Sequence, residues 1–231
     1  MCASFHTWQL GEVTVSKGVC VVAGVGSGVG MAVARRFARE GVDVALLARD
    51  PLRSDNHARD VADLSGRADI QVIGEAVDLN DTVSLQHAMV RIIGALGTRT
   101  VLVYNAACRH QMPALQMTAA EFTAESGVNV VGALHCVQFI ALGRFAAGNG
   151  RIIFSGGGLA LHPQYGVGVS ALSAGKSALR ALGYALHGEL SEAGIYVSMV
   201  TIAGTVATNT PFDADRIVEY YWNLYMQPRS E

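Results

Sequence analysis

The chain has 231 residues, of which 51% are hydrophobic and 16% are charged, so its length and composition fit one α/β domain with a large core. The 17 basic and 19 acidic residues give a formal net charge of -2 and form no basic block, which argues against nucleic acid and against an anionic membrane as partners. No apolar stretch reaches the roughly 18 to 20 residues that a membrane-spanning helix needs.

Residues 1–17 lack the basic start and apolar core of a signal peptide, and we interpret them as an N-terminal arm that precedes a single domain at 18–231. Phe5 and Trp8 in this arm could pack on the domain or on a neighbouring subunit. The four cysteines show neither paired nor metal-like spacing, and Cys20 lies in a predicted core strand. The sequence therefore predicts reduced thiols, a cytoplasmic protein and no metal site.

The first predicted elements are a strand at 19–23, a glycine-rich turn and a helix that ends near Gly41. Because the strand is apolar throughout, we expect a parallel strand that helices cover on both faces. The turn leaves the first N–H groups of the helix free, and such groups bind anions, here a pyrophosphate. The turn residues that we expect to contact it are Gly24, Gly26, Ser27, Gly28, Val29 and Gly30.

The spacing of these glycines distinguishes two dinucleotide-binding patterns. Glycines at offsets 0, 2 and 5 do not fit the turn, whereas offsets 0, 4 and 6 fit Gly24, Gly28 and Gly30. The second pattern resembles that of the short-chain dehydrogenase/reductase family. The resemblance implies a Rossmann-type, doubly wound parallel sheet and a nicotinamide cofactor. The alternative is a glycine-rich turn that only lets a helix pack closely on a strand.

A second strand is predicted at 42–48, and Arg49 and Asp50 follow it. In dinucleotide-binding folds an acidic residue near this point binds the ribose hydroxyls of NAD, and an arginine accommodates the extra phosphate of NADP. Ala48 stands where NAD-dependent members of the resembling family have an acidic residue. We therefore predict that NADP binds through Arg49, and Asp50 keeps NAD as the alternative.

The next elements are a polar helix at 54–64, a strand at 70–76, a helix to about 95 that the turn at 78–81 caps, and a strand at 100–104. The resemblance implies that Asp78 accepts a hydrogen bond from the adenine amino group and that Leu79 lies beside it; a turn or capping role is the alternative for Asp78. Residues 104–107 resemble the family's Asn-Asn-Ala-Gly motif. The cofactor contacts that this motif implies are Asn105, Ala106 and Ala107.

A long helix is predicted at 118–147, and it carries Asn129 near its middle, where asparagine is a mediocre helix former. The resemblance implies that Asn129 holds a water that links the catalytic lysine to solvent. The alternative is a polar side chain whose hydrogen bonds are satisfied within a helix pair.

A fifth strand at 151–155 runs into three glycines; a helix at 170–193, a sixth strand at 195–202 and a helix at 213–226 follow. The segment after the sixth strand resembles the family's Pro-Gly-x-x-x-Thr motif, with Ala203 in place of the proline. The resemblance implies that Thr208 binds the nicotinamide amide. The predicted cofactor contacts in this segment are Gly204, Thr205, Val206 and Thr208.

The catalytic residues that the resemblance implies are only partly present. Lys176 matches the family's lysine, which contacts the cofactor and lowers the pKa of a tyrosine four residues earlier, but that position is Leu172. The family's serine would fall near Gly157. Because leucine cannot donate a proton, Tyr165 is our candidate for a displaced donor; the alternative is that its ring packs on the rim of the site.

The resemblance thus predicts an NADP-dependent oxidoreductase that transfers a hydride to or from a small carbonyl or alcohol. One alternative is an NAD(P)-binding protein with little or no turnover that acts as a redox sensor or partner subunit, and another is a fold that serves only oligomerisation. The helices predicted from 118 and from 170 would, by resemblance, build a homodimer or homotetramer.

Overall fold

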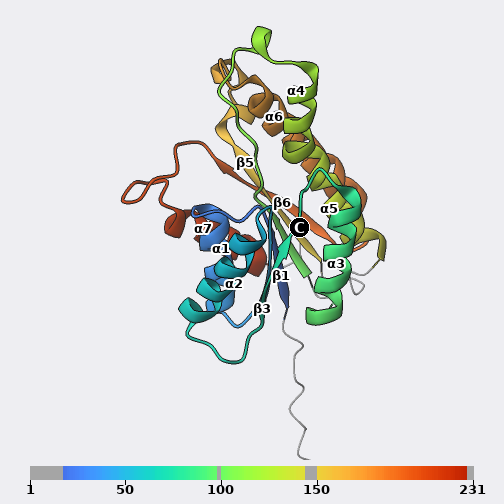
Figure 1. Ribbon diagram of the computed structural model, residues 1–231, viewed down its shortest axis with the longest axis vertical. Coiled ribbons are helices and arrows are strands. Elements are labelled where there is room, and N and C mark those ends of the chain that lie inside the picture. Colours follow the sequence, from blue (N-terminus) through green and yellow to red (C-terminus); the bar gives the residue numbers. More distant parts are fainter. Residues whose placement is uncertain (1–17, 98–99, 144–149, 228–231) are drawn as a thin grey trace, which may run out of the picture.

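The computed structural model describes residues 18–97, 100–143 and 150–227. Six parallel strands form one sheet in the order β3-β2-β1-β4-β5-β6 (Figure 1). The strands are β1 (Val19–Ala23), β2 (Asp43–Ala48), β3 (Val72–Ala76), β4 (Thr100–Tyr104), β5 (Arg151–Gly157) and β6 (Tyr196–Ile202). This order confirms the predicted Rossmann-type, doubly wound sheet.

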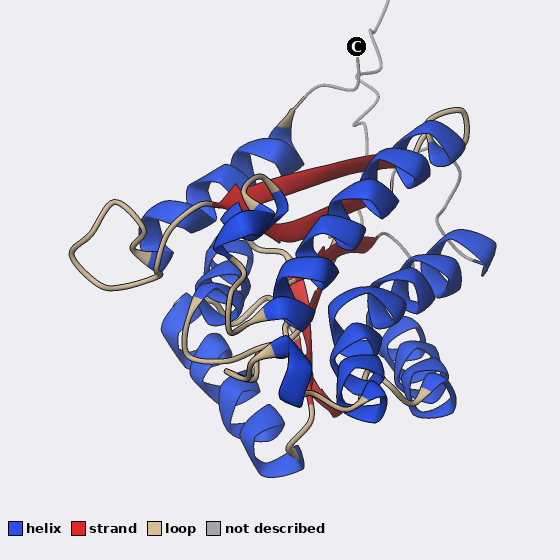
Figure 2. Cartoon of the chain, turned by 90° about the horizontal axis from the view of Figure 1, so that it is seen from above, coloured by secondary structure: helices blue, strands red, loops and turns tan. Residues whose placement is uncertain are grey.

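Helices cover both faces of the sheet (Figure 2). One face packs against α1 (Val29–Arg39), α2 (Pro51–Ser65) and α7 (Ala214–Met226). The other packs against α3 (Thr82–Leu96), α5 (Gly132–Gly143) and α6 (Ser170–Leu190), and α4 (Ala119–Ser126) lies against α6. Within the described residues, no helix is long and apolar enough to cross a membrane.

The first strand lies at the centre of the sheet, between β2 and β4. All five of its residues are buried, with Val19, Val21 and Ala23 in one core and Cys20 and Val22 in the other. Successive side chains of a strand point to opposite faces, so a strand covered on both faces must be apolar at every position. This is the pattern from which the strand was predicted.

Three predicted helices differ from the structure, and one of them, predicted at 170–193, ends at Leu190. The helix predicted at 54–64 begins at Pro51, because the Asp50 carboxylate accepts a hydrogen bond from the Arg53 N–H at 3.2 Å and proline suits the first helical position. The helix predicted at 118–147 is instead α4, a π-helical turn at Gly127–Val131 that contains Asn129, and α5. The predicted helix end beyond 143 and the predicted arm at 1–17 lie outside the described residues.

A glycine lets α6 approach this π-helical turn closely. A Cβ at Gly175 would lie 2.6 Å from the Cβ of Asn129, closer than side-chain carbons approach in folded proteins. Gly175 precedes Lys176 in the chain. The close packing therefore fixes the position of the helical turn that carries the lysine.

We expect Gly175→Ala to lower the free energy of unfolding by about 1 to 3 kcal/mol, because the added methyl group overpacks this contact. The matched control is Gly188→Ala in the same helix, where an added Cβ meets no atom within 4 Å. The control should be neutral or stabilising by up to ~1 kcal/mol, since alanine is the better helix former. Urea unfolding of both variants tests this, and equal effects would contradict the packing account.

Candidate nucleotide-binding and active site

The glycines of the first turn serve two different purposes. Gly24 has a φ of +89°, and a Cβ there would lie 2.4 Å from the Cα of Ala106; a Cβ at Gly30 would lie 2.5 Å from the Gly24 carbonyl oxygen. These two positions therefore need glycine for packing. A Cβ at Gly26 or Gly28 would meet nothing within 4 Å, so these two residues leave open space in front of α1.

A polar side chain holds this turn against the end of β4. Asn105 donates a hydrogen bond from Nδ2 to the Gly24 carbonyl oxygen at 2.9 Å, and its backbone N–H donates to the Ala23 carbonyl oxygen at 2.8 Å. The turn after β1 and the segment after β4 are thereby joined at the carboxyl edge of the sheet. Open α/β sheets bind ligands at such an edge, where neighbouring strands send their connections to opposite faces.

A cavity of about 380 Å³ lies at this edge. Its walls come from the ends of β1, β2, β3 and β4 and from the π-helical turn. The lining residues are Gly24, Val25, Gly26, Leu47, Ala48, Arg49, Arg53, Val77, Leu79, Asn105, Ala106, Ala107, Cys108 and Val128. Seven of the predicted cofactor contacts are among them, namely Gly24, Gly26, Arg49, Leu79, Asn105, Ala106 and Ala107.

Other predicted contacts lie beside this cavity and do not line it. Ser27 and Gly28 lie in the turn, whereas Val29 and Gly30 are buried at the start of α1. Asp78 is exposed, and its carboxylate accepts a hydrogen bond from the Asn80 N–H at 3.0 Å, which is the turn role left open above.

Two arginines line the cavity after β2. Arg49 follows the strand, and Arg53 lies in the first turn of α2. Asp50 between them caps α2, and one of its carboxylate oxygens lies 3.9 Å from the Arg53 Nε. Arg53 was not among the predicted contacts, although the Asp50-Pro51 pair signals a helix start that places Arg53 in the first helical turn.

Lys176 is buried on α6 and donates a hydrogen bond from Nζ to the Ser155 carbonyl oxygen at 2.7 Å. Burial lowers the pKa of Lys176 to about 8. A Cβ at Gly157 would lie 3.5 Å from the lysine Cγ, an ordinary contact distance. The resemblance places a serine at position 157. This position therefore faces the lysine side chain and has room for the Cβ of a serine.

The serine that is present nearby has a different partner. Ser155 lies in β5, and its Oγ shares a 2.6 Å hydrogen bond with the Tyr221 hydroxyl on α7. Both groups are buried. The Ser155 hydroxyl is therefore bound to a helix on the opposite face of the sheet from α6 and does not replace the missing serine at 157.

Tyr165 belongs to a short 3₁₀ helix, Pro163–Tyr165, that precedes α6. Its side chain is 72% exposed, and its ring lies 6.0 Å from that of His162, measured between centroids. Within the described part of the chain, no hydrogen bond joins its hydroxyl to Lys176. The ring lies at the surface, as in the alternative that sequence analysis left open for it.

Asn129 is buried, and both ends of its side-chain amide bind the backbone of Cys108. Its Oδ1 accepts a hydrogen bond from the Cys108 N–H at 2.8 Å, and its Nδ2 donates to the Cys108 carbonyl oxygen at 3.1 Å. Asn129 thus fixes the segment after β4 to the π-helical turn. The Asn129 amide is therefore satisfied by the loop after β4, whereas the alternative for this residue expected its partners within a helix pair.

The segment after β6 lies beside the end of β5. A Cβ at Gly158 would lie 3.1 Å from the Cα of Ala203, and a Cβ at Gly204 would lie 2.3 Å from the Phe212 ring. The segment therefore begins at the same edge of the sheet as Gly157. The remaining contacts predicted there are exposed, namely Thr205, Val206 and Thr208.

Known proteins share this fold and sequence pattern. A family model described as short chain dehydrogenase matches residues 18–216. The short-chain dehydrogenase/reductase eriH of Hericium erinaceus is 27% identical over 199 residues, which cover 84% of this chain and 76% of that protein.

Two solved structures are similar to the chain. A metagenomic short-chain oxidoreductase in complex with NADP has a TM-score of 0.79 and 26% identity, covering 94% of each chain. A short-chain dehydrogenase from Sphingobium yanoikuyae in complex with NADPH has a TM-score of 0.77 and 27% identity, covering 89% of this chain and 82% of that one. The chain belongs to the short-chain dehydrogenase/reductase family, a family of oxidoreductase enzymes.

Proposed function

We propose that the chain is an NADP-dependent oxidoreductase that transfers a hydride to or from a small carbonyl or alcohol. The observation that carries the choice of cofactor is the pair Arg49 and Arg53 on the cavity, next to an Asp50 that caps a helix. Guanidinium groups bind phosphate strongly, and the second phosphate of NADP lies on the ribose that this part of the fold holds. The similar proteins crystallised with NADP and NADPH support the same choice.

In this proposal the turn at 24–30 holds the diphosphate, because Gly26 and Gly28 leave the N–H groups at the start of α1 accessible. Leu79 would contact the adenine, with Asp78 beside it at the rim, and Asn105 to Ala107 would form the wall beside the ribose. Thr208 and the segment from Gly204 bind the nicotinamide end. Use of NAD, assembly into a homodimer or homotetramer, and a cytoplasmic location stay predictions.

The bound nicotinamide would supply or accept the hydride, and the protein must then supply or accept a proton at the substrate oxygen. Leu172 cannot do this. We propose that Lys176 does so, because its side chain lies beside Gly157 and burial lowers its pKa to about 8, and a general acid works best when its pKa lies near the working pH. We therefore assign the proton to Lys176, directly or through a water, ahead of the exposed Tyr165.

The second candidate function is nucleotide binding without useful turnover. Two positions favour it, since Leu172 and Gly157 lack the hydroxyl groups that the family places there. A positioned general acid contributes about 10² to 10⁴ in rate, so losing it could leave binding intact and chemistry slow. Measuring turnover of a panel of small carbonyls with NADPH separates the two functions.

Arg49→Ala should weaken NADPH binding by roughly 10- to 100-fold, because one or two charge-assisted hydrogen bonds to the extra phosphate are lost. The variant should change NADH binding little, because NADH lacks this phosphate. Arg39→Ala, an exposed arginine at the end of α1, is the matched control and should change neither. Titration calorimetry with both cofactors measures this. Equal losses for NADPH and NADH in Arg49→Ala would contradict the assignment of Arg49 to the extra phosphate.

Carbonyl reduction at saturating substrate and NADPH should fall as the pH rises through about 8, because only the protonated Lys176 can give up a proton. Alcohol oxidation should rise over the same range. Tyr165→Phe should leave both profiles unchanged. Loss of the pH-dependent phase in Tyr165→Phe would instead make that tyrosine the donor.

Introducing a hydroxyl group at position 172, or at positions 172 and 157 together, should raise the rate of carbonyl reduction. Leu172→Tyr places a phenol one helical turn before Lys176, and Gly157→Ser adds a hydroxyl in ordinary contact with the lysine. We expect Leu172→Tyr to raise kcat about 10-fold or more, and the double variant to raise it further. Leu172→Phe is the control for added ring volume, and an equal gain in this control would show that the phenol supplies no proton.

A further inference from the structure

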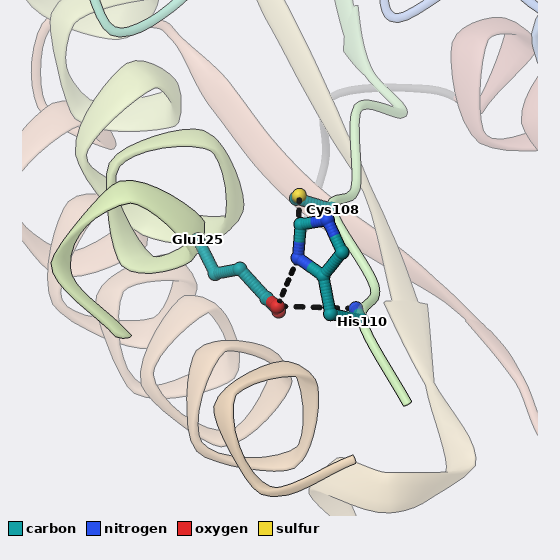
Figure 3. Close-up of side chains that lie close together, drawn as sticks. All are labelled: Cys108, His110 and Glu125. Atoms are coloured by element: carbon teal, nitrogen blue, oxygen red, sulfur yellow. Dashed lines mark hydrogen bonds and ion pairs between the residues drawn. The ribbon is translucent and has the colours of Figure 1, made fainter. Parts of the chain in front are cut away.

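Three side chains that can bind metals meet beside the cavity, at the end of β4 and on α4 (Figure 3). They are Cys108, His110 and Glu125, and one ligand atom from each lies within 4.8 Å of the other two. The Cys108 Sγ lies 4.0 Å from the His110 Nδ1, and that nitrogen lies 2.7 Å from the Glu125 Oε1. The spacing of these three residues in the sequence does not indicate a metal site, because Glu125 lies 15 residues after His110 and reaches the loop only through the packing of α4.

The burial of Glu125 shows that this group is more than a surface ion pair. Its side chain is 2% exposed, whereas that of His110 is 67% exposed. Its Oε1 also accepts a hydrogen bond from the His110 N–H at 3.0 Å, but its Oε2 is buried without a hydrogen-bond partner. A buried carboxylate oxygen is costly unless it has a partner, and a cation in this position would be one.

The geometry does not fit a cysteine nucleophile activated by a histidine. In such a relay the nucleophile contacts one ring nitrogen and the acid contacts the other. Here the Nδ1 of His110 faces both the sulfur and the carboxylate. The sulfur of Cys108 and the carboxylate of Glu125 both lie near the Nδ1 of His110, and this arrangement suits three ligands of one shared ion.

We propose that Cys108, His110 and Glu125 form a binding site for zinc or a similar divalent cation. Thiolate, imidazole and carboxylate are the three ligand types that zinc takes, at about 2.0 to 2.3 Å each. Tetrahedral ligands at those lengths lie roughly 3.3 to 3.6 Å apart, between the two distances observed.

The same three residues help to line a second cavity of about 260 Å³, so an ion bound by them would lie at its wall. This cavity shares Arg49, Cys108 and Val128 with the nucleotide cavity. A zinc ion with three protein ligands keeps a position open for a water or for an oxygen of a small molecule. Asn129 holds the backbone of Cys108, so the loop that carries two of the ligands is fixed before any ion binds.

The 231-residue chain, freed of metal by dialysis against a chelator, should bind one equivalent of Zn²⁺ in calorimetry. With Co²⁺ as the probe, it should show the sulfur-to-metal charge-transfer band of a thiolate ligand. Cys108→Ser should abolish that band, and His110→Gln and Glu125→Gln should each lower Zn²⁺ affinity by more than the ~10- to 100-fold typical of residues that only support a ligand. His87→Gln, an exposed histidine on α3, is the matched control and should bind Zn²⁺ like the parent protein.

Because His110 is exposed, its variant should fold, and circular dichroism checks this. Unchanged Zn²⁺ binding in His110→Gln, or a Co²⁺ complex without a thiolate band, would overturn the proposal and leave a plain histidine–glutamate ion pair. The proposal does not depend on the proposed function. A protein that binds Zn²⁺ here but no NADPH would refute the cofactor assignment alone, and the reverse result would refute the metal site alone.

Discussion

The contact of Gly24 with the backbone of Ala106 is the constraint on which the site depends. A left-handed φ at Gly24 turns the chain away from β1, and the absence of a side chain lets the turn lie directly on the segment after β4. The Asn105 side chain then fixes the two segments with one hydrogen bond. The cavity and the start of α1 take their positions from this contact. So does the loop with Cys108 and His110, because that loop continues from the segment after β4.

The features that depend on neighbouring residues in the chain were the ones that the sequence predicted correctly. A strand buried on both faces must be apolar at each residue, which identified β1, and glycines at fixed offsets identified the turn that follows it. Close approach of other backbone atoms at Gly24 and Gly30 gives these offsets a physical reason. The alternative of a glycine-rich turn that serves packing alone explains these two glycines, but it does not explain the open space at Gly26 and Gly28.

Features that depend on tertiary contacts could not be predicted in the same way. The π-helical turn at Asn129 forms where α6 packs on it at Gly175, and no periodicity in the sequence indicates a turn of that kind. The approach of Glu125 to His110 depends on how α4 lies beside the loop after β4. Arg53 was a different case, because a cap residue followed by proline did signal the start of its helix.

At the candidate active site, Lys176 matches the lysine that the family resemblance implies, whereas Leu172 and Gly157 lack the hydroxyl groups implied at their positions. Lys176 keeps its buried place and its hydrogen bond to the Ser155 carbonyl oxygen, while glycine and leucine occupy the positions of the other two groups. A residue that served only packing would not need a buried amine, since burial of a charged lysine is costly. The burial of this amine therefore supports the proposed role of Lys176 in proton transfer.

A crystal structure of the protein with NADP is the most direct test of the central claim, that the cavity between the ends of β1, β2 and β4 is a nucleotide site. The account predicts the diphosphate over Gly26 and Gly28, and the 2′-phosphate between Arg49 and Arg53. A nucleotide bound elsewhere, or a cavity that stays empty at saturating NADP, would contradict it.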